Sequence, residues 1–427
     1  MESGSVGSNI QNTGKVRLGR TCFLRGCGAL SGVRARYSVW WRRIDKVIIC
    51  KFALVAGTFK KIRRRIWLIL NIGVVFWVLA GAFSMQVPPH EFWPAGFLAF
   101  SLPAALVLNF LFLLYWLLRG SWYLVLPLAV VVLGWNYYGR LLNMQLVTQE
   151  VPTEAKTLHV LSFNVHMFRA YKDDKDRDAS EEMIEWIATH PADVYCLQEF
   201  YNDRESTVYN AISKIGTRYD KYRYTSGVPR NRNQGEFGVA IFSRYPIVNQ
   251  GEILFGQASA NRVAWVDVDV KGDTVRVYAS HLQSMSIKQE DIENTYTAFG
   301  NQAEMEREGR NLARRLRKGF IARGQQVEVL REHYTSSPYP VIVAGDFNDI
   351  PFSYTYQVLT GELINSFEVA GFGIGATYNG PLPFLRIDNQ FYSDGLRVYG
   401  FETHHEMGLS DHYPISARYV LEPKAED

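Results

Sequence analysis

Three long runs without a charged residue constrain the fold of this chain more than any other feature. They cover residues 66–85, 92–118 and 121–138 of the 427-residue sequence. About 20 apolar residues in a helix cross the roughly 30 Å hydrocarbon core of a bilayer, whereas buried helices of a soluble bundle keep a polar face. Trp and Tyr residues lie near the ends of the runs, as they do at membrane interfaces. The sequence therefore predicts a three-helix transmembrane anchor over residues 66–138.

The basic residues that flank these runs predict their orientation. Five Lys or Arg residues between positions 60 and 65 immediately precede the first run, and the loop 85–91 contains none. Because basic flanks remain in the cytoplasm, the N-terminus is predicted to be cytoplasmic. Three crossings then place everything after Tyr138 outside it. We expect an integral protein of a bacterial inner or cell membrane with an extracytoplasmic C-terminal domain.

The charge of the chain is divided unevenly between its two ends. Residues 1–65 carry 15 Lys or Arg and two acids, so the rest of the chain is acidic although the net charge is +4. A basic head beside a mildly acidic body favours a membrane or targeting role for the head. We predict a disordered tail over residues 1–65, a linker over residues 139–156 and a catalytic domain over residues 157–422.

Short β-patterned runs alternate with amphipathic helices after the linker, which is typical of a mixed α/β domain with packed sheets. Polar residues stand where many of these apolar runs end. An Asn at a strand end is usually a turn residue, and a single His or Glu there carries little information. Together the set suggests one site, and it comprises Asn164, Glu199, His281, Asp346, Asn348, Asp388, Asp411 and His412.

The residue types in this set fit a hard cation and a phosphate. Mg²⁺ prefers oxygen ligands, which Glu199 and Asp411 supply as carboxylates and Asn164 as an amide. His281 and His412 titrate near neutral pH. The sequence has no HExxH motif and no Cys-rich cluster that would indicate zinc.

Six motifs in this order resemble the endonuclease/exonuclease/phosphatase superfamily: SFNVHMF, LQEF, SHLQS, AGDFNDIP, RIDNQFYS and LSDHYPI. The resemblance covers about residues 157–422. It implies a four-layered α/β sandwich of the deoxyribonuclease I type, preceded here by the three transmembrane helices. It also implies a hydrolase that acts on phosphate esters with a divalent metal.

The resemblance further implies a role for each residue of the set. Glu199, Asn164 and Asp411 would hold Mg²⁺ or Mn²⁺ or its waters. Asp346 would orient and deprotonate the attacking water, and Asn348 would bind a phosphate oxygen. His412 would donate to the phosphoryl oxygen while Asp388 fixes its tautomer. His281 matches the deoxyribonuclease I and sphingomyelinase branch, in which a His contacts phosphate or protonates the leaving group.

Several alternatives remain open at this point. The substrate is a nucleic acid or a phospholipid headgroup, a phosphomonoesterase is a further possibility, and a catalytically silent membrane-anchored binding module belongs to another class. His166 is interpreted as a surface side chain, with a substrate contact as the alternative. Residues 311–334 are expected to form a long helix that is basic around 311–323. It is interpreted as a solvated helix that packs Leu316, Phe320, Val327 and Leu330 inward, with phosphate binding by its basic part as the alternative.

Overall fold

The computed structural model describes residues 31–144, 154–170, 176–230, 235–256, 260–285 and 301–422, with the backbone alone for residues 31–57 and 228–230. The chain divides into two units, Met1–Trp67 and Leu68–Asp427.

Helix α1 runs from Ser31 to Ser84. It begins within the segment for which the sequence predicted disorder, and it corrects that prediction for residues 31–65. This segment contains no proline and only two glycines, so it holds few residues that interrupt a helix. The predicted disorder of residues 1–30 lies outside the described residues.

The membrane-anchor segment is less regular than three straight spans. One stretch, Thr58–Ser84, is long and apolar enough to cross a bilayer. The second predicted span is broken into α2 (Pro94–Phe100) and α3 (Leu102–Leu118), bent by 43°. The third consists of η1 (Trp122–Leu124), α4 (Val125–Leu133) and α5 (Trp135–Leu141), with a bend of 72°. The structure thus has one continuous candidate span, and three only if each bent pair crosses as one.

Proline and glycine account for the two breaks. Pro103 stands two residues after Ser101, where α2 ends, and a proline ring clashes with the carbonyl four residues earlier in a helix. Gly134 separates α4 from α5. Hydrogen bonds then hold the helices together, since Trp116 Nε1 donates to Asn71 Oδ1 at 3.0 Å and Asn109 Nδ2 lies 3.0 Å from the Tyr138 hydroxyl. We call helices α1 from Leu68 through α5 the bundle.

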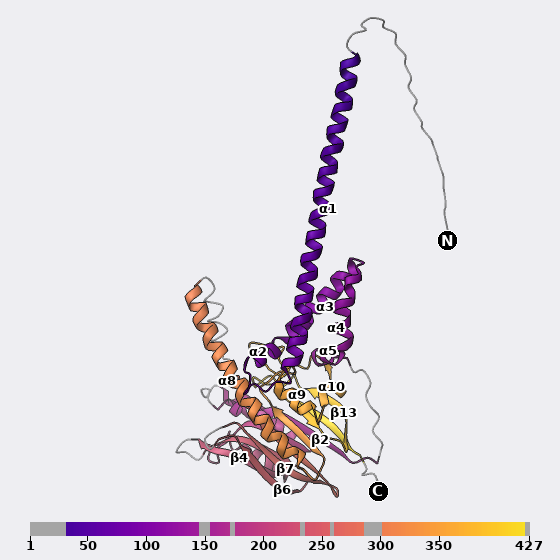
Figure 1. Ribbon diagram of the computed structural model, residues 1–427. Coiled ribbons are helices and arrows are strands. Elements are labelled where there is room, and N and C mark those ends of the chain that lie inside the picture. The colour runs from indigo at the N-terminus through magenta and orange to yellow at the C-terminus, as the bar shows by residue number, and fades with distance from the viewer. Residues whose placement is uncertain are drawn as a thin grey trace, which may run out of the picture. The chain divides into compact units, whose positions relative to one another are not determined.

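Two six-stranded sheets form the body of the second unit (Figure 1). In one sheet the order is β13-β14-β2-β3-β5-β4, and in the other it is β10-β12-β9-β8-β7-β6. The first sheet comprises β2 (Thr157–Asn164), β3 (Val194–Asn202), β4 (Tyr222–Arg230), β5 (Gly235–Ser243), β13 (Leu396–Thr403) and β14 (Ile415–Leu421). The second comprises β6 (Ile247–Leu254), β7 (Arg262–Val270), β8 (Asp273–His281), β9 (Val341–Asp346), β10 (Ile364–Asn365) and β12 (Asp388–Tyr392). A small pair joins β1 (Asn143–Met144) to β11 (Phe372–Gly373).

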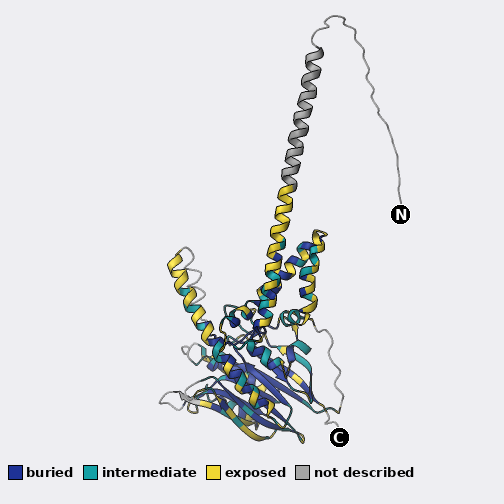
Figure 2. Ribbon diagram, viewed as in Figure 1, coloured by how far each residue is buried: buried dark blue, intermediate teal, exposed yellow. Residues whose placement is uncertain are grey.

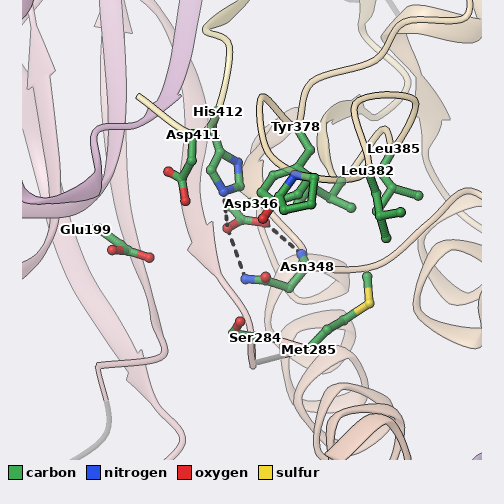
Figure 3. A pocket seen from close by; sticks show the side chains of 12 residues that line it. Glu199, Ser284, Met285, Asp346, Asn348, Tyr378, Leu382, Leu385, Asp411 and His412 are labelled. Atoms are coloured by element: carbon green, nitrogen blue, oxygen red, sulfur yellow. Dashed lines mark hydrogen bonds and ion pairs between the residues drawn. The ribbon is translucent and has the colours of Figure 1, made fainter. Parts of the chain in front are cut away.

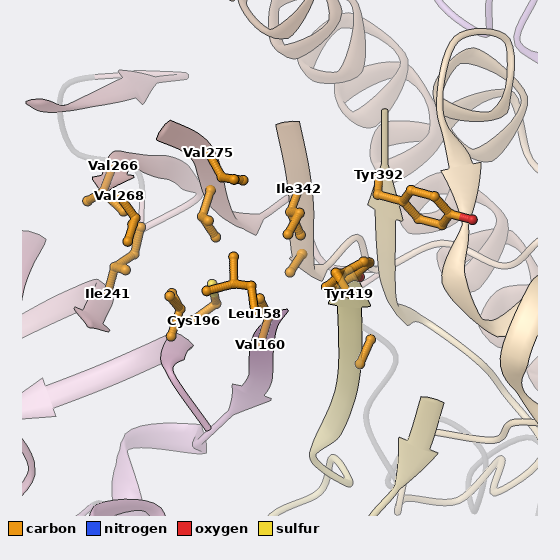
Figure 4. Close-up of a cluster of buried hydrophobic side chains, with 14 of the residues drawn as sticks. Leu158, Val160, Cys196, Ile241, Val266, Val268, Val275, Ile342, Tyr392 and Tyr419 are labelled. Carbon is orange, nitrogen blue, oxygen red and sulfur yellow. The ribbon is translucent and has the colours of Figure 1, made fainter. Parts of the chain in front are cut away.

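Helices cover the outer face of each sheet. Between the sheets lies a core rich in Val and Ile, including Val160, Ile241, Val266 and Ile342 (Figure 4). Helix α6 (Arg177–Thr189) packs on the first sheet and α8 (Gln302–Thr335) on the second, each over an apolar cluster of its own. The predicted α/β sandwich is confirmed. The shorter helices are η2 (His166–Arg169), η4 (Ile212–Gly216), η5 (Thr217–Tyr219), α9 (Tyr354–Thr360) and α10 (Ser366–Ala370).

Strand direction brings the ends of distant strands to one edge. Strands β2 and β3 are parallel, as are β8 and β9, and parallel neighbours end on the same side of a sheet. His281, the last residue of β8, is paired with Asp346, the last residue of β9. Asp388 begins the antiparallel β12 opposite the same Asp346.

Helix α8 packs between the sandwich and the bundle. Leu316, Phe320, Val327 and Leu330 are buried, as the sequence predicted. The Phe320 ring stands edge-on to Phe97 of α2 with centroids 5.2 Å apart. Arg323 is not on a basic surface, because its guanidinium is fully buried and its Nε lies 3.0 Å from Asp349 Oδ2. This ion pair joins α8 to the loop that follows β9.

Three buried histidines predict how stability depends on pH. His190 contacts both others, with ring centroids 5.4 Å from His159 in a tilted arrangement and 5.2 Å from His404 edge-on. Burial, followed by the charge of Arg418, lowers the pKa of His159 to about 4, and burial together with His404 lowers the pKa of His190 to about 3. The charged groups that face the cluster are Asp193, Arg244, Glu402, Glu406 and Arg418.

Folding keeps His159 and His190 neutral, whereas in the unfolded chain they become charged below about pH 6.5. We expect the melting temperature to fall by several °C as the pH is lowered from 7 to 4.5, which thermal denaturation measures. His190→Asn, whose amide can still accept from Ala192 N, should reduce that fall. The exposed His405→Asn should not change it. An equal fall in the His190 variant would contradict this account.

Candidate active site

The structure brings all eight sequence-predicted side chains to one end of the sandwich. Each lies at or within two residues of a strand end, apart from Glu199, which is inside β3, and Asp411 and His412, which precede β14 by four and three residues. Hydrogen bonds and ion pairs connect seven of them, and Asp411 lines the same cavity as Glu199, Asp346 and His412. Residues separated by up to 248 positions therefore meet in space. The group comprises Asn164, Glu199, His281, Asp346, Asn348, Asp388, Asp411 and His412.

Asp346 lies at the centre of this group and is 1% exposed. Its Oδ1 accepts the backbone N–H of Asn348 at 2.8 Å, and its Oδ2 accepts Nδ2 of Asn348 at 3.0 Å. Nδ2 of Asn164, which belongs to the other sheet, also donates to Oδ2 at 3.0 Å. Burial raises the pKa of Asp346 to about 6, against the opposing charge of His412. The carboxyl therefore titrates close to neutral pH.

His412 and Asp388 form a buried pair beside Asp346. His412 Nδ1 lies 2.9 Å from Asp388 Oδ2, and its Nε2 lies 3.8 Å from Asp346 Oδ2. Burial alone would lower the pKa of His412, but the charges of Asp388 and Asp346 outweigh it and raise the pKa well above its usual value. The imidazole is therefore held as a cation with Nδ1–H directed at Asp388.

His281 faces the same centre from the end of β8. Its Nε2 lies 3.7 Å from Glu199 Oε1 and 3.9 Å from Asp346 Oδ2. Its Nδ1 is buried and finds no hydrogen-bond partner within the described part of the chain. The ring therefore presents Nε2 to the two carboxylates.

Glu199 reaches the site because β3 is irregular there. The register of β3 against β5 shifts between Leu197 and Phe200, and Glu199 has a φ of 49°. A bulge of this kind redirects one side chain out of the regular alternation. Asn348 also has a positive φ, of 52°. Strained backbone of this kind concentrates at functional sites.

Asp411 is paired with His166, which the sequence interpretation had treated as a surface side chain. His166 Nδ1 lies 2.9 Å from Asp411 Oδ1, and its side chain stays partly exposed beside this carboxylate. Burial opposes ionisation of Asp411, but the hydrogen bond from His166 and the charge of His412 lower its pKa to about 2. Asp411 is therefore a carboxylate throughout the physiological pH range.

A cavity of about 130 Å³ opens among these residues (Figure 3). Glu199 and Asp411 lie on one side of Asp346, while Met285, Leu382 and Leu385 lie on the other. The remaining lining residues are Ser284, Asn348, Tyr378, Pro381, Ile387 and His412. One half of the cavity is thus anionic and the other apolar.

The donor atoms on the anionic side fit a hard divalent cation. Glu199 and Asp411 line the cavity with carboxylates, and Mg²⁺ and Mn²⁺ favour such oxygen ligands. The amide oxygen of Asn164 accepts the backbone N–H of His166 at 3.0 Å, and its Nδ2 donates to Glu199 at 3.3 Å. Asn164 therefore orients the Glu199 carboxylate in this structure.

Asp346, Asp388 and His412 form a second group with ligand atoms within 4.8 Å of one another. Its His412 Nδ1 is already bound to Asp388. This bond favours a proton-holding role for the group over a metal-holding one.

Some residues of the site were missed by the sequence analysis. Thr377 Oγ1 accepts the backbone N–H groups of Ile387 and Asp388, each at 3.0 Å, and so fixes the start of β12. The Tyr378 ring lies edge-on to His412, with centroids 5.6 Å apart. Both belong to the loop GATYNGPLPFLRID. Only the final Asp of that loop carried a recognisable signal.

Two family models match separate parts of the chain. The model of the Endonuclease/Exonuclease/phosphatase family matches residues 161–412. A second model, described as a domain of unknown function, matches residues 64–141, where α5 also ends. No curated protein matches the chain.

Solved structures similar to this chain include an endonuclease/exonuclease/phosphatase from Beutenbergia cavernae, with 17% identity over 62% of this chain and 72% of that one and a TM-score of 0.44. The human Nocturnin catalytic domain with bound sulfate is 16% identical, over 62% of this chain and 95% of that one, with a TM-score of 0.42. A mannosyl-6-phosphatase from Bacteroides thetaiotaomicron is 17% identical, over 62% of this chain and 100% of that one, with a TM-score of 0.41.

The anionic half of the cavity predicts which substitutions weaken metal binding. Glu199→Gln and Asp411→Asn each remove one negative ligand, so we expect Mn²⁺ to bind at least about tenfold more weakly in either variant. Electron paramagnetic resonance of free Mn²⁺ measures this without any substrate. Asp394→Asn, on an exposed turn, is the matched control. Unchanged affinity in both site variants would contradict the assignment.

Proposed function

Because the chain belongs to the Endonuclease/Exonuclease/phosphatase family, whose members are phosphoesterase hydrolases, we propose that it is a membrane-anchored, divalent-metal-dependent phosphodiesterase. The observation that carries this proposal is the convergence of eight polar side chains on one cavity. A catalytically silent binding module would have no need for a buried carboxyl held beside a buried imidazolium. Burying such groups is costly unless they are paired.

The proposed reaction is attack by water on phosphorus in line with the leaving oxygen. Asp346, whose pKa of about 6 lies near neutrality, takes a proton from the water. A new O–P bond forms, the P–O bond to the leaving group breaks, and the departing alkoxide takes up a proton. Asn164 and Asn348 hold the Asp346 carboxylate in position through their Nδ2 atoms.

The two histidines face the point where negative charge develops in the transition state. His412 is cationic and its Nε2 faces the centre, so it donates to a phosphoryl oxygen. Asp388 fixes the tautomer through Nδ1. His281, with Nε2 directed inward, contacts phosphate or protonates the leaving group.

The sequence predicted that Asn348 binds a phosphate oxygen. In this geometry its Nδ2 is not free to do so unless the side chain rearranges. Its Nδ2 donates to Leu282 O at 3.1 Å and to Asp346 at 3.0 Å, so both amide hydrogens have protein acceptors. Holding Asp346 is the role that this geometry supports. A bound Mg²⁺ or Mn²⁺, held by Glu199 and Asp411 with Asn164 behind them, would withdraw charge from the phosphate.

Exposed apolar surface on the bundle supports the membrane anchor. Phe76 is 72% exposed, Leu118 87% and Leu133 87%. Figure 2 shows long exposed stretches on these helices. Soluble proteins rarely expose contiguous apolar surface on this scale. A bilayer would cover it, with Asn71–Trp116 and Asn109–Tyr138 satisfied inside.

The two ends of the α2–α5 segment support an extracytoplasmic catalytic domain. Pro89, in the loop before α2, lies against Gly324 of α8. Arg140, in α5, donates to Pro351 O at 3.1 Å. Both ends of the segment are therefore on the side of the sandwich, whether or not α3 and α4 cross the bilayer completely. One complete crossing by α1 is enough to separate the catalytic domain from the basic cytoplasmic end.

Substitutions at the centre of the site test the enzymatic proposal. We expect Asp346→Asn and His412→Ala to reduce hydrolysis of bis-p-nitrophenyl phosphate with Mg²⁺ or Mn²⁺ by at least about 10²-fold, because each removes a group needed in the transition state. EDTA should abolish turnover. Circular dichroism and thermal melting should show that both variants still fold.

Matched controls for these variants are Asp394→Asn and His405→Ala, which change the same residue types at exposed positions. Both should retain the rate of the unmodified protein. Retained turnover in the Asp346 and His412 variants would show that the roles are wrong. No turnover of diesters or monoesters with any divalent ion would show that the protein is not this kind of enzyme.

Protease protection tests the predicted orientation. In intact cells whose outer barrier has been opened, we expect added protease to digest the catalytic domain, because the basic flank of α1 remains in the cytoplasm. A tag at the N-terminus should survive until the membrane is dissolved by detergent. Survival of the catalytic domain instead would reverse the topology.

A further inference from the structure

The apolar half of the cavity has no role in the chemistry proposed above. Met285, Pro381, Leu382, Leu385 and Ile387 line it, directly beside Asp346 and Asn348 (Figure 3). A water molecule, a metal ion and a phosphoryl group need none of these side chains. Apolar walls of this kind bind apolar parts of ligands.

This wall is preformed by a folded loop. Thr377 N and Tyr378 N both donate to Leu385 O, at 2.9 Å and 3.1 Å, and Leu385 N donates to Leu382 O at 3.1 Å. The guanidinium of Arg386 is buried 4.0 Å above the Phe367 ring and fixes the loop from behind. Leu382 and Leu385 therefore face the cavity before any ligand arrives.

The wall continues into the apolar contact between the sandwich and the bundle. Met285 and Ile387 belong to the same buried cluster as Met85, Ala99 and Leu102 of the bundle segment. Tyr378 and Leu385 pack at its edge. A hydrocarbon chain that leaves the cavity along this wall thus runs toward the part of the protein proposed to lie in the bilayer.

Exposed apolar residues lie beside the same loop. Phe372, Ile374 and Phe384 are 65%, 53% and 62% exposed. Phe372 is paired with Met144, itself 65% exposed and three residues after α5. Large exposed side chains next to a membrane helix are suited to the bilayer interface. The loop therefore has one face on the cavity and a neighbouring face suited to lipid.

The charge of the lining argues against a nucleic acid at this position. Among the described residues that line the cavity there is no Lys or Arg. Binding of nucleic acid depends chiefly on such cations along the phosphate backbone. A single phosphate with an apolar chain needs no such row of cations.

We propose that the substrate is a membrane lipid phosphodiester, with its phosphate at Asp346 and its hydrocarbon portion along Met285, Leu382 and Leu385. This inference rests on the proposed function and names its substrate class. Water adds to phosphorus, the headgroup or the lipid alcohol leaves with a proton, and no further reactant is needed. The apolar wall selects for the hydrocarbon chain of the lipid, and the bundle keeps the cavity beside the bilayer that contains this substrate.

Chromogenic diesters that differ only in their alkyl group test this inference. The full chain in nanodiscs is given methyl, dodecyl and thymidine diesters of p-nitrophenyl phosphate with Mg²⁺ or Mn²⁺. All three share one leaving group. We expect kcat/KM to be at least tenfold higher for the dodecyl ester than for the other two, because the wall removes the chain from water.

Variants distinguish binding of the alkyl chain at the wall from partitioning of the ester into the bilayer, because partitioning is the same for every variant. Leu382→Gln and Leu385→Gln should each reduce the dodecyl-to-methyl ratio of kcat/KM at least about tenfold. Leu254→Gln, an exposed leucine at the end of edge strand β6, is the matched control and should leave the ratio unchanged. The same ratio in all three variants would overturn the inference.

The outcomes also distinguish this inference from the proposed function. Hydrolysis of all three esters without chain preference, or a preference for the thymidine ester, contradicts the lipid substrate and leaves the phosphodiesterase intact. Hydrolysis of none of them, with either metal, contradicts both.

Discussion

The hydrogen bond from Asn164 Nδ2 to Asp346 Oδ2, which crosses between the two sheets, is the interaction on which the rest of the site depends. It joins the end of β2 to the end of β9, so the two halves of the sandwich supply one centre. Because Asp346 is buried, it needs such donors to carry a charge at all. Asn164 also donates to Glu199 and thereby sets the position of the carboxylate on the anionic side. The Asn164 amide thus fixes the position of the proton-transfer side of the cavity relative to the metal-binding side.

The same loop that carries Asp346 also connects the site to the bundle. Asp349 Oδ2 accepts a hydrogen bond at 3.0 Å from Nε of the buried Arg323 of α8, and the Pro351 carbonyl accepts one from Arg140 of α5. Removing one partner of a buried ion pair costs about 3–5 kcal/mol. The bundle is therefore attached to the catalytic domain within five residues of its central carboxyl. A tether of this kind keeps the cavity beside the membrane anchor.

The sequence was sufficient for much of this structure because strand ends and motifs are local signals. The apolar run before Asp346 and the GDFN and SDH motifs predicted both the sandwich and the residues that converge. The break at Ser101 was not predicted, because hydropathy reports apolar length and is insensitive to bends. The helix over residues 31–65 was not predicted, because the basic charge of that segment was interpreted as typical of a disordered tail. The ion pair of His166 with Asp411 and the burial of Arg323 depend on partners 245 and 26 positions away. The apolar wall over residues 381–387 carries no motif, and only its fold directs it into the cavity.

The account depends on direct attack by water at phosphorus, with Asp346 as the base and no covalent intermediate on the protein. The stereochemical course of hydrolysis tests this most directly. A phosphorothioate diester of known configuration is hydrolysed in ¹⁸O-labelled water, and the configuration of the product is determined by ³¹P nuclear magnetic resonance. A single in-line displacement predicts inversion at phosphorus. Retention would require two displacements through a phosphorylated side chain and would contradict the account.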